Sequence, residues 1–366
     1  GAGNEMVFYG NGNTIISGKI NNHDYSQDRI IKVGLIYGTT LWLQNDQNAN
    51  TSGIRIDNGT VRVASAGALG LNTGRLAIDL NNGRLEVRSD VLNSFAQKNV
   101  YVRDNTNSSL LVDHALDSSA VGGTFTFGDL NAARSNTWFY LNSRNGFGAS
   151  FTGLNNLIGG GGGNNAGINN DGNGLLTLDA DLWRQGDGTA RRFYIRGNGD
   201  TLVTGDLLQS HASAAHAFTK ENQGYLTMLG TAGTTRGSVD IVGGTLEIRG
   251  VGAFANASAI NLGGGSTSTD QPGTLVYAGP GETLAKPILL AGKRANSIPM
   301  LMASGTGALV LTGNITAADT ISKTFRIGGT STADNTIASV IANNGAFLTS
   351  LQKMGVGTWV LAPTAS

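Results

Sequence analysis

The stretch Gly74-Arg-Leu-Ala-Ile-Asp-Leu-Asn-Asn-Gly-Arg-Leu-Glu-Val87 indicates the fold of the whole chain, because it holds two short alternating segments joined by an Asn-Gly turn. In each segment apolar residues take every second position, and a polar or charged residue stands between them. Successive side chains of a β-strand point to opposite faces, so the pattern predicts strands with one buried face. Asn and Gly favour tight turns. The stretch therefore predicts two brief strands separated by a turn.

The same alternation recurs along the whole chain, for example at 54–56, 61–63, 239–241 and 246–248. Gly accounts for 55 of the 366 residues, and Asn, Asp, Ser and Thr fill the gaps between the alternating segments. These residues form turns, so the strands are predicted to be short and frequent. Helical periodicity is nearly absent. The chain is therefore predicted to be all-β, for which a sandwich, a barrel and a solenoid are the alternatives.

Internal repeats favour the solenoid. The segment 172–178 recurs as 305–311, an offset of 133 positions (305 − 172), and the segment 12–20 recurs as 199–207. Stacked units that share one continuous core produce such internal similarity. We predict a right-handed parallel β-helix, or β-solenoid, with roughly 20 to 25 residues per coil. It is built from three diverged super-repeats, of which the third is partial.

The predicted organisation is a single β-helix over 1–366. The first repeat copy covers 1–104, the second covers 172–304, and the partial third covers 305–366. The segment 105–171 matches no other copy closely, and it ends near a run of five glycines at 159–163. We predict irregular coils there, with an insertion or a long Gly-rich loop.

Composition excludes several classes of function. Lys and Arg number 25, as do Asp and Glu, so the formal net charge is zero. Phosphate affinity comes from clustered Lys and Arg, so no nucleic-acid partner is expected. Cys is absent, which excludes disulfides, thiol catalysis and zinc–sulfur sites. No apolar run is long enough for a transmembrane helix, so no transmembrane segment is expected.

No cofactor, metal or catalytic residue is expected. His211 and His216 lie five positions apart, a spacing that does not place two rings on one helical face. The stretch 169–174 superficially resembles a calcium loop, but it lacks the downstream Glu that would complete one. We predict a turn there.

Four acidic residues are the basis for the alternative interpretation that the chain is an enzyme. Paired carboxylates on one face of a β-helix are the chemistry of polysaccharide-cleaving enzymes. The candidates are Asp179, Asp181, Asp200 and Asp206. The matching positions of the predicted third copy include Thr312, so the repeat does not require acids there. A solvated outer face is the favoured interpretation.

A family resemblance rests on two motifs. The stretch Asp57-Asn-Gly-Thr-Val-Arg-Val-Ala-Ser-Ala-Gly-Ala-Leu-Gly70, continued by 74–87, resembles the autotransporter-associated β-strand repeat. That repeat has a Gly-Thr-Leu-x-Val strand, an Ala-Leu-Gly turn and a second Gly-x-Leu strand. Lys353-Met-Gly-Val-Gly-Thr-Trp-Val-Leu361 looks like its other hallmark, Lys-x-Gly-x-Gly-Thr-Leu-x-Leu. The resemblance implies a parallel β-helical passenger-type domain displayed outside a Gram-negative-type bacterium.

The expected function is that of an extracellular structural or adhesive rod. The end coils lack polar caps, so the chain is either a fragment of a longer rod or a subunit that stacks head to tail on itself into a filament. The predicted assembly interface consists of Met6, Phe8, Tyr9, Trp359 and Leu361.

A second candidate surface is an exposed aromatic patch formed by Trp138, Phe139 and Tyr140. Its expected partner is a carbohydrate of the cell surface or matrix. The alternatives to an adhesive rod are a carbohydrate-binding or polysaccharide-cleaving β-helix and a toxin-type autotransporter passenger.

Overall fold

The computed structural model of the chain describes residues 6–21, 30–34, 38–51, 53–103, 106–132, 136–153, 155–157, 165–184, 190–209, 215–264, 272–292, 298–318 and 320–363. Within these ranges the regular elements are β-strands and three single-turn 3₁₀ helices. No helix in the described ranges is long and apolar enough to cross a bilayer. The chain divides into two compact units, Gly1–Asp187 (unit 1) and Gly188–Ser366 (unit 2).

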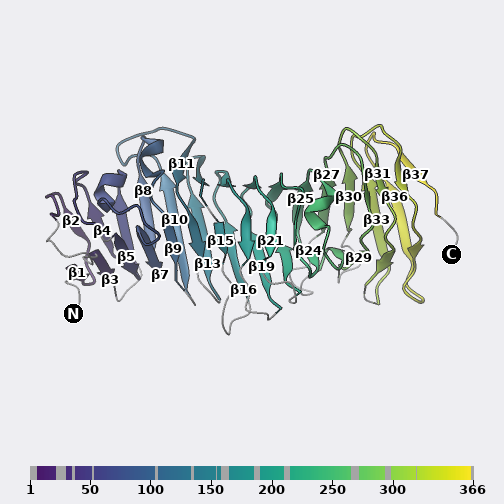
Figure 1. Cartoon of the computed structure of the whole chain (residues 1–366), viewed down its shortest axis with the longest axis horizontal. Helices are drawn as coiled ribbons and strands as arrows, with labels where there is room; N and C mark the ends of the chain where they lie inside the picture. Colours follow the sequence, from purple (N-terminus) through teal and green to yellow (C-terminus); the bar gives the residue numbers. More distant parts are fainter. Residues whose placement is uncertain are drawn as a thin grey trace. The chain divides into compact units, whose positions relative to one another are not determined.

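Unit 1 contains three parallel sheets (Figure 1), here called sheets 1, 2 and 3. Sheet 1 runs in hydrogen-bonded order through β1 (Met6–Tyr9), β3 (Ile30–Val33), β5 (Ile54–Asp57), β7 (Ile78–Asn81), β9 (Val100–Val102), β12 (Leu130–Ala132), β15 (Asn155–Leu157) and β18 (Leu182–Arg184). Sheet 2 runs through β2 (Thr14–Ile16), β4 (Thr40–Leu43), β6 (Thr60–Val63), β8 (Arg84–Arg88), β10 (Asn107–Asp113), β13 (Trp138–Ser143) and β16 (Asn165–Asn170). Sheet 3 consists of β11 (Gly123–Phe127), β14 (Phe147–Phe151) and β17 (Leu176–Leu178).

Unit 2 repeats this construction. One set of paired strands is β19 (Arg192–Arg196), β22 (Ala217–Lys220), β24 (Val239–Ile241), β26 (Ile260–Leu262), β29 (Ile288–Leu290), β32 (Ile315–Ala317) and β35 (Ile341–Ala342). A second set is β20 (Thr201–Val203), β23 (Tyr225–Met228), β25 (Gly244–Ile248), β27 (Gly273–Tyr277), β30 (Met300–Ala303), β33 (Lys323–Gly328) and β36 (Thr349–Lys353). A third set is β28 (Glu282–Leu284), β31 (Leu309–Leu311), β34 (Asn335–Ile337) and β37 (Trp359–Leu361), and the unit also contains β21 (Leu207–Gln209).

The strand registers show that each unit is wound in coils. Ile54 pairs with Ile30 before it and with Ile78 after it, so the two coils that meet at β5 have the same length. A shorter coil runs from Thr40 to its partner Thr60. Each strand lies parallel to its equivalents in the neighbouring coils, which confirms the predicted parallel β-solenoid.

Coils in the segment 105–171 are longer than the coils around β5. The register steps from 107 to 138 and from 138 to 167 both exceed the step from 30 to 54. The strands of this segment nevertheless pair in register with the rest of sheet 2. The glycine run at 159–163 lies outside the described residues. The right-handed winding and the division into three super-repeats stay predictions.

A strand–strand–3₁₀ unit recurs in both halves of the chain. The helix η1 (Ala66–Leu69) follows β5 and β6, η2 (Leu92–Phe95) follows β7 and β8, and η3 (Val251–Phe254) follows β24 and β25. Gly70 ends η1 with a φ of 86°, where a Cβ atom would also collide with the side chain of Asn50. The Ala-Leu-Gly turn of the resemblance is therefore one turn of 3₁₀ helix that requires Gly at its end.

Alternating apolar residues fill the interior of each unit, and phenylalanines stack along unit 1. The ring centroids of Phe95 and Phe127 lie 5.5 Å apart, and those of Phe127 and Phe151 lie 5.4 Å apart. Phe139 meets Phe151 edge-on at 5.7 Å. All four rings are buried. Parallel strands in register place equivalent side chains above one another, so one aromatic position repeated in successive coils becomes a stack.

Removing one ring from this stack is expected to destabilise unit 1 strongly. Phe127→Ala leaves a cavity between two aromatic neighbours, so the free energy of unfolding should fall by about 3–5 kcal/mol. Urea denaturation of the full chain measures the loss. The matched control is Val121→Ala, because Val121 is 79% exposed and should change stability by less than about 0.5 kcal/mol. Equal effects of the two substitutions would contradict the stack as a source of stability.

Two of the buried lysines, Lys98 and Lys220, hold turns rather than ion pairs. The Lys98 ammonium donates to the backbone oxygens of Gly70 (2.6 Å) and Asn72 (2.9 Å) in the preceding coil. The Lys220 ammonium donates to the backbone oxygens of Glu221 (2.8 Å) and Asn222 (3.1 Å). Burial disfavours the charged ammonium, and it lowers the pKa of Lys220 to about 8.

The shifted pKa of Lys220 makes stability depend on pH. Between about 8 and 10.5 the unfolded chain keeps a proton on this side chain that the folded chain has released. The free energy of unfolding therefore rises with pH across this window. In Lys220→Met the rise should be smaller by about 1–3 kcal/mol, as measured by urea denaturation from pH 7 to 10.5. The exposed Lys19 provides the control substitution, Lys19→Met, which should keep the wild-type slope. An unchanged slope in Lys220→Met would contradict the desolvation of its ammonium.

Candidate functional site

The residues of the predicted assembly interface lie on strands at the ends of their sheets. Met6 and Tyr9 on β1 are 47% and 72% exposed, and Phe8 between them is half-buried. On β37, Leu361 is exposed, and the indole N–H of Trp359 donates to the backbone oxygen of Gly328 at 2.9 Å. Head-to-tail contact between copies stays a prediction.

The predicted aromatic patch is wrong for one of its three members. Trp138, Phe139 and Tyr140 are consecutive on β13, so their side chains alternate between the two faces of sheet 2. Phe139 is fully buried against Phe151, whereas Trp138 and Tyr140 are half-buried on the outer face. The strand period limits any outer aromatic surface here to Trp138 and Tyr140.

The stretch that resembles a calcium loop is a hydrogen-bonded turn, as predicted. The Asn169 amide donates to Asp171 Oδ2 at 2.6 Å, and the Asn170 amide donates to the backbone oxygen of Gly174 at 3.2 Å. The N–H of Gly172 donates to Asn170 Oδ1. These bonds connect the end of β16 to the bend that leads to β17.

Two of the four acids considered for catalysis bind backbone amides. Asp200 Oδ1 accepts the N–H of Tyr225 at 3.1 Å, and Asp206 Oδ1 accepts the N–H of Ala232 at 2.8 Å. Each bond joins one coil to the next, which gives these carboxylates a structural role. Across the ranges that the structure describes, no group of three or more His, Asp or Glu side chains is placed to hold a metal ion.

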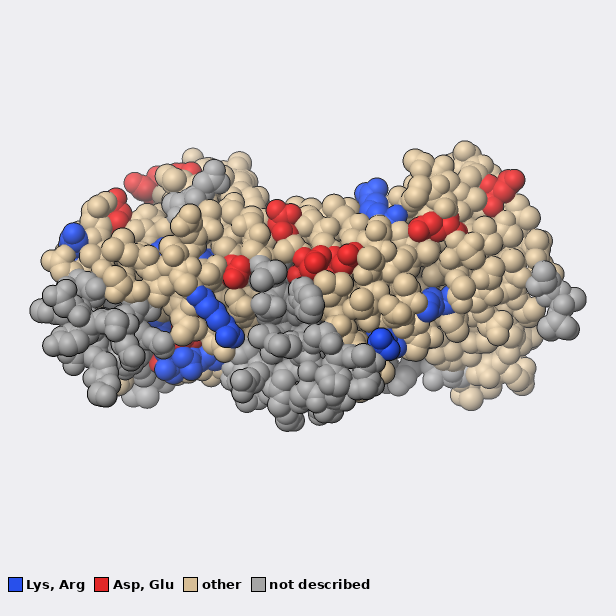
Figure 2. All heavy atoms as spheres, viewed as in Figure 1, with Lys and Arg blue, Asp and Glu red and all other residues tan. Residues whose placement is uncertain are grey.

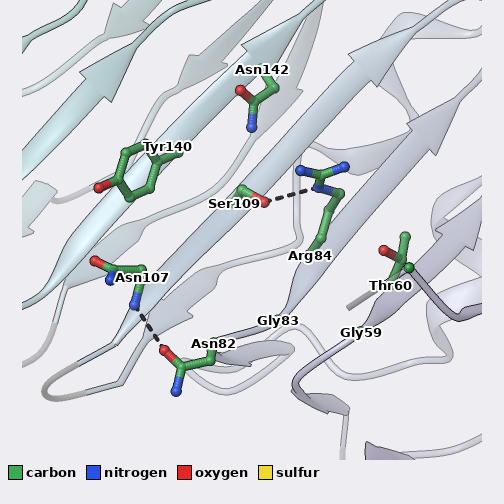
Figure 3. Close-up of a pocket in the computed structure, with 10 residues that line it drawn as sticks. Gly59, Thr60, Asn82, Gly83, Arg84, Asn107, Ser109, Tyr140 and Asn142 are labelled. Carbon is green, nitrogen blue, oxygen red and sulfur yellow. Dashed lines mark hydrogen bonds between the residues drawn. The ribbon is translucent and has the colours of Figure 1, made fainter. Parts of the chain in front are cut away.

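The outer face of sheet 2 carries a polar groove of about 560 Å³, shown in Figure 3. Tyr140 of the predicted aromatic patch is one of its walls. The other lining residues come from the turns and strands of the preceding coils. They are Gly38, Gly59, Thr60, Asn82, Gly83, Arg84, Asn107, Ser109 and Asn142.

Strand register aligns the side chains of the groove. Thr60 on β6 pairs with Arg84 on β8, Arg84 with Ser109 on β10, and Ser109 with Tyr140 on β13. These four residues form one outward column across four coils. Their chain neighbours on each strand, such as Leu85 and Leu141, point into the core. The column therefore follows directly from the period of two.

An Asn-Gly turn forms one side of the groove. Asn82 has a left-handed backbone conformation with a φ of 58°, which Asn tolerates better than most residues. Its Oδ1 accepts the N–H of Asn107 at 3.0 Å, so the turn before β8 is tied to the start of β10 (Figure 3). This side-chain bond adds to the hydrogen bonds between the two coils just before β8 begins, at the first residue of β10.

Among the described residues that line the groove, Arg84 is the only charged one, and it is exposed. Its Nε donates to Ser109 Oγ at 3.1 Å, and it makes no ion pair with any residue that the structure describes. The neighbouring arginines of sheet 2 are paired. Arg62 binds Glu86 at 3.2 Å, and Arg88 binds both Glu86, at 2.6 Å, and Asp113.

The rest of the visible surface is mostly uncharged. Figure 2 shows small groups of basic and acidic side chains separated by wide areas of other residues, in agreement with a charged fraction of 14%. A lone arginine among amides and hydroxyls therefore gives the groove a distinct chemistry. It has donors for an anion and hydrogen-bonding groups for a polar ligand. The described lining residues include no carboxylate or imidazole.

Sequence reasoning found Tyr140 but missed Arg84, Ser109 and the three asparagines. Arg84 was visible only as the outward residue of an alternating strand. The usable signal is the nearly constant spacing that separates Thr60, Arg84 and Ser109 along the chain. That spacing becomes meaningful once the coil length is known.

Comparison with known proteins gives one distant similarity. The chain is 33% identical over 149 residues to the protein named Adhesin BmaC autotransporter of Brucella suis biovar 1 (strain 1330). The match covers 39% of this chain and 4% of the length of that relative. No protein-family model and no solved structure matches the chain. The chain is thus distantly similar to an autotransporter adhesin, as the sequence motifs indicated, and its β-solenoid is the fold expected of an autotransporter passenger.

Proposed function

We propose that this chain is an adhesive segment of a passenger displayed on the surface of a Gram-negative-type bacterium. The observation that carries the proposal is the similarity to an autotransporter adhesin over 149 residues, in a chain that folds as a parallel β-solenoid. The solenoid presents outward columns of residues that repeat from coil to coil, and such extended surfaces serve binding in other repeat proteins. The role is binding rather than catalysis.

The outer surface of sheet 2 supports this role. The outward positions that line the groove carry Arg84 among Thr60, Ser109, Tyr140 and Asn142, which are polar but uncharged. Hydroxyl and amide groups bind partners by hydrogen bonds that salt screens little, whereas exposed charges lose strength at physiological ionic strength. The uncharged hydroxyl and amide groups around Arg84 are therefore suited to contact with surfaces in saline surroundings.

Beads coated with the full chain should adhere to cultured epithelial cells several-fold better than albumin-coated beads of the same protein density. Counting the retained beads after a defined wash measures the effect. The matched control is the chain with Phe127→Asp, which places a charge in the aromatic stack and should unfold unit 1 while the surface composition is kept. Adhesion that equals the albumin level would contradict the proposal. Equal adhesion by the unfolded control would show a nonspecific sticky chain.

Self-association is a second candidate, favoured by apolar side chains on strands at the ends of their sheets. Tyr9 is 72% exposed on β1, Leu361 is 57% exposed on β37, and Val356 nearby is 80% exposed. β1 has a paired neighbour on one side, β3, and β37 has one on one side, β34. Strand edges of this kind pair readily with other strands. Stacking of one copy on the next would give a non-closing contact and a filament.

The double substitution Tyr9→Asp and Leu361→Asp should abolish such stacking, because it places like charges at both contact faces. Sedimentation velocity at two protein concentrations, with negative-stain electron microscopy, measures the assembly. Val121→Asp changes an equally exposed apolar residue away from these strands and should leave assembly intact. A wild-type chain that stays monomeric at both concentrations would contradict self-association, and so would fibres formed by the double variant.

A further inference from the structure

We infer that the groove on sheet 2 of unit 1 binds a saccharide chain that carries carboxylate groups, such as a polyuronate. The inference rests on the proposed adhesive function and deepens it, because it assigns a ligand class to one surface of the solenoid. The charge of the groove, its hydrogen-bonding groups and its length all point to this ligand class.

The charge points to an anion. Arginines elsewhere in unit 1 have carboxylate partners, as Arg55 does in Asp57 at 2.8 Å and Arg103 does in Asp79 at 2.6 Å. Among the residues that the structure describes, the Arg84 guanidinium has only the neutral hydroxyl of Ser109 as a partner. A guanidinium carries five N–H donors in a planar fork that matches a carboxylate with two parallel bonds. The exposed fork of Arg84 therefore offers a place for a carboxylate from a ligand.

The groups that flank Arg84 select a polyhydroxylated partner. Figure 3 places Asn142 and Tyr140 on β13 to one side of Arg84, Asn107 and Asn82 below them, and Thr60 on the opposite side. Each amide both donates and accepts hydrogen bonds, as sugar hydroxyls do. Tyr140 adds a partly exposed aromatic ring, whose apolar face suits the C–H face of a sugar ring and whose edge is polar.

The length of the groove favours a chain over a single ring. The column from Thr60 to Tyr140 crosses four coils, which are about 4.8 Å apart and therefore span about 14 Å. A linear saccharide laid across the coils would meet polar groups on each of them.

The test is isothermal titration calorimetry of the full chain with trigalacturonate and with maltotriose, its uncharged counterpart in length. We expect trigalacturonate to bind and the affinity to fall as salt is raised, because part of the attraction is between charges. Arg84→Gln should weaken trigalacturonate binding about 10-fold or more, since a hydrogen-bonded charge pair is lost. Tyr140→Ala should weaken it as well. Circular dichroism and thermal melting check that both variants fold.

The matched control variant is Arg144→Gln. Arg144 is exposed in the same unit, directly after β13, but it does not line the groove. This variant should bind trigalacturonate as the wild type does. Unchanged binding by Arg84→Gln would overturn the inference, and so would equal loss in both arginine variants. Equal affinity for maltotriose would overturn the carboxylate requirement. Equal affinity for a short poly-glutamate peptide would overturn the assignment of a saccharide as the ligand.

Bead adhesion with Arg84→Gln separates this inference from the proposed function. If wild-type beads adhere but trigalacturonate does not bind, the groove inference fails and the adhesive function stands. If trigalacturonate binding depends on Arg84 but beads do not adhere, the adhesive function fails and the groove keeps its ligand class. Reduced adhesion by Arg84→Gln beads, together with weaker trigalacturonate binding, supports both.

Discussion

Hydrogen bonding between successive parallel coils holds every strand of this chain in place. Most strands are only three to seven residues long, too short to be stable alone. Each strand inside a sheet is held because the strands of the coils before and after it accept and donate its backbone hydrogen bonds, as β6 and β10 do for β8. The same pairing fixes the register. Once register is fixed, every side chain stands above its equivalent in the next coil.

Where the strands end, side chains extend this coil-to-coil bonding. Asn48 lies between coils, accepting the N–H of Ile20 at 2.8 Å and donating to the backbone oxygen of Ala68 at 2.9 Å. Lys98 performs a similar task with its ammonium at the turn after η1. Buried backbone groups without a partner are costly, so a solenoid with long turns needs such side chains at its corners. This requirement explains why polar residues are buried inside a chain of low charge.

Register also produces the candidate site. Thr60, Arg84, Ser109 and Tyr140 are far apart along the chain, yet pairing brings them into one outward column. In the adjacent outward column, Arg62 and Glu86 meet and neutralise each other. The residue one coil away decides which arginine is paired. Arg62 meets the carboxylate of Glu86, whereas Arg84 meets the neutral residues Thr60 and Ser109. The coils repeat the same backbone geometry, but their outward residues vary. The surface of the solenoid therefore differs in chemistry from one column to the next.

The strand period, the turn positions and the parallel solenoid could all be predicted from the sequence. Alternation in stretches such as 74–87 indicates which residues are buried, and the internal repeats indicate that the coils stack on one another. The sequence also located Tyr140, and a strict period of two would have excluded Phe139 from an exposed patch. The position of Arg84 between Thr60 and Ser109, and the greater length of the coils near Trp138, became known only from the folded chain. The reason is physical: local alternation sets the face of each side chain, whereas its neighbours across coils depend on turn lengths, and these are set by how the whole coil closes around the core.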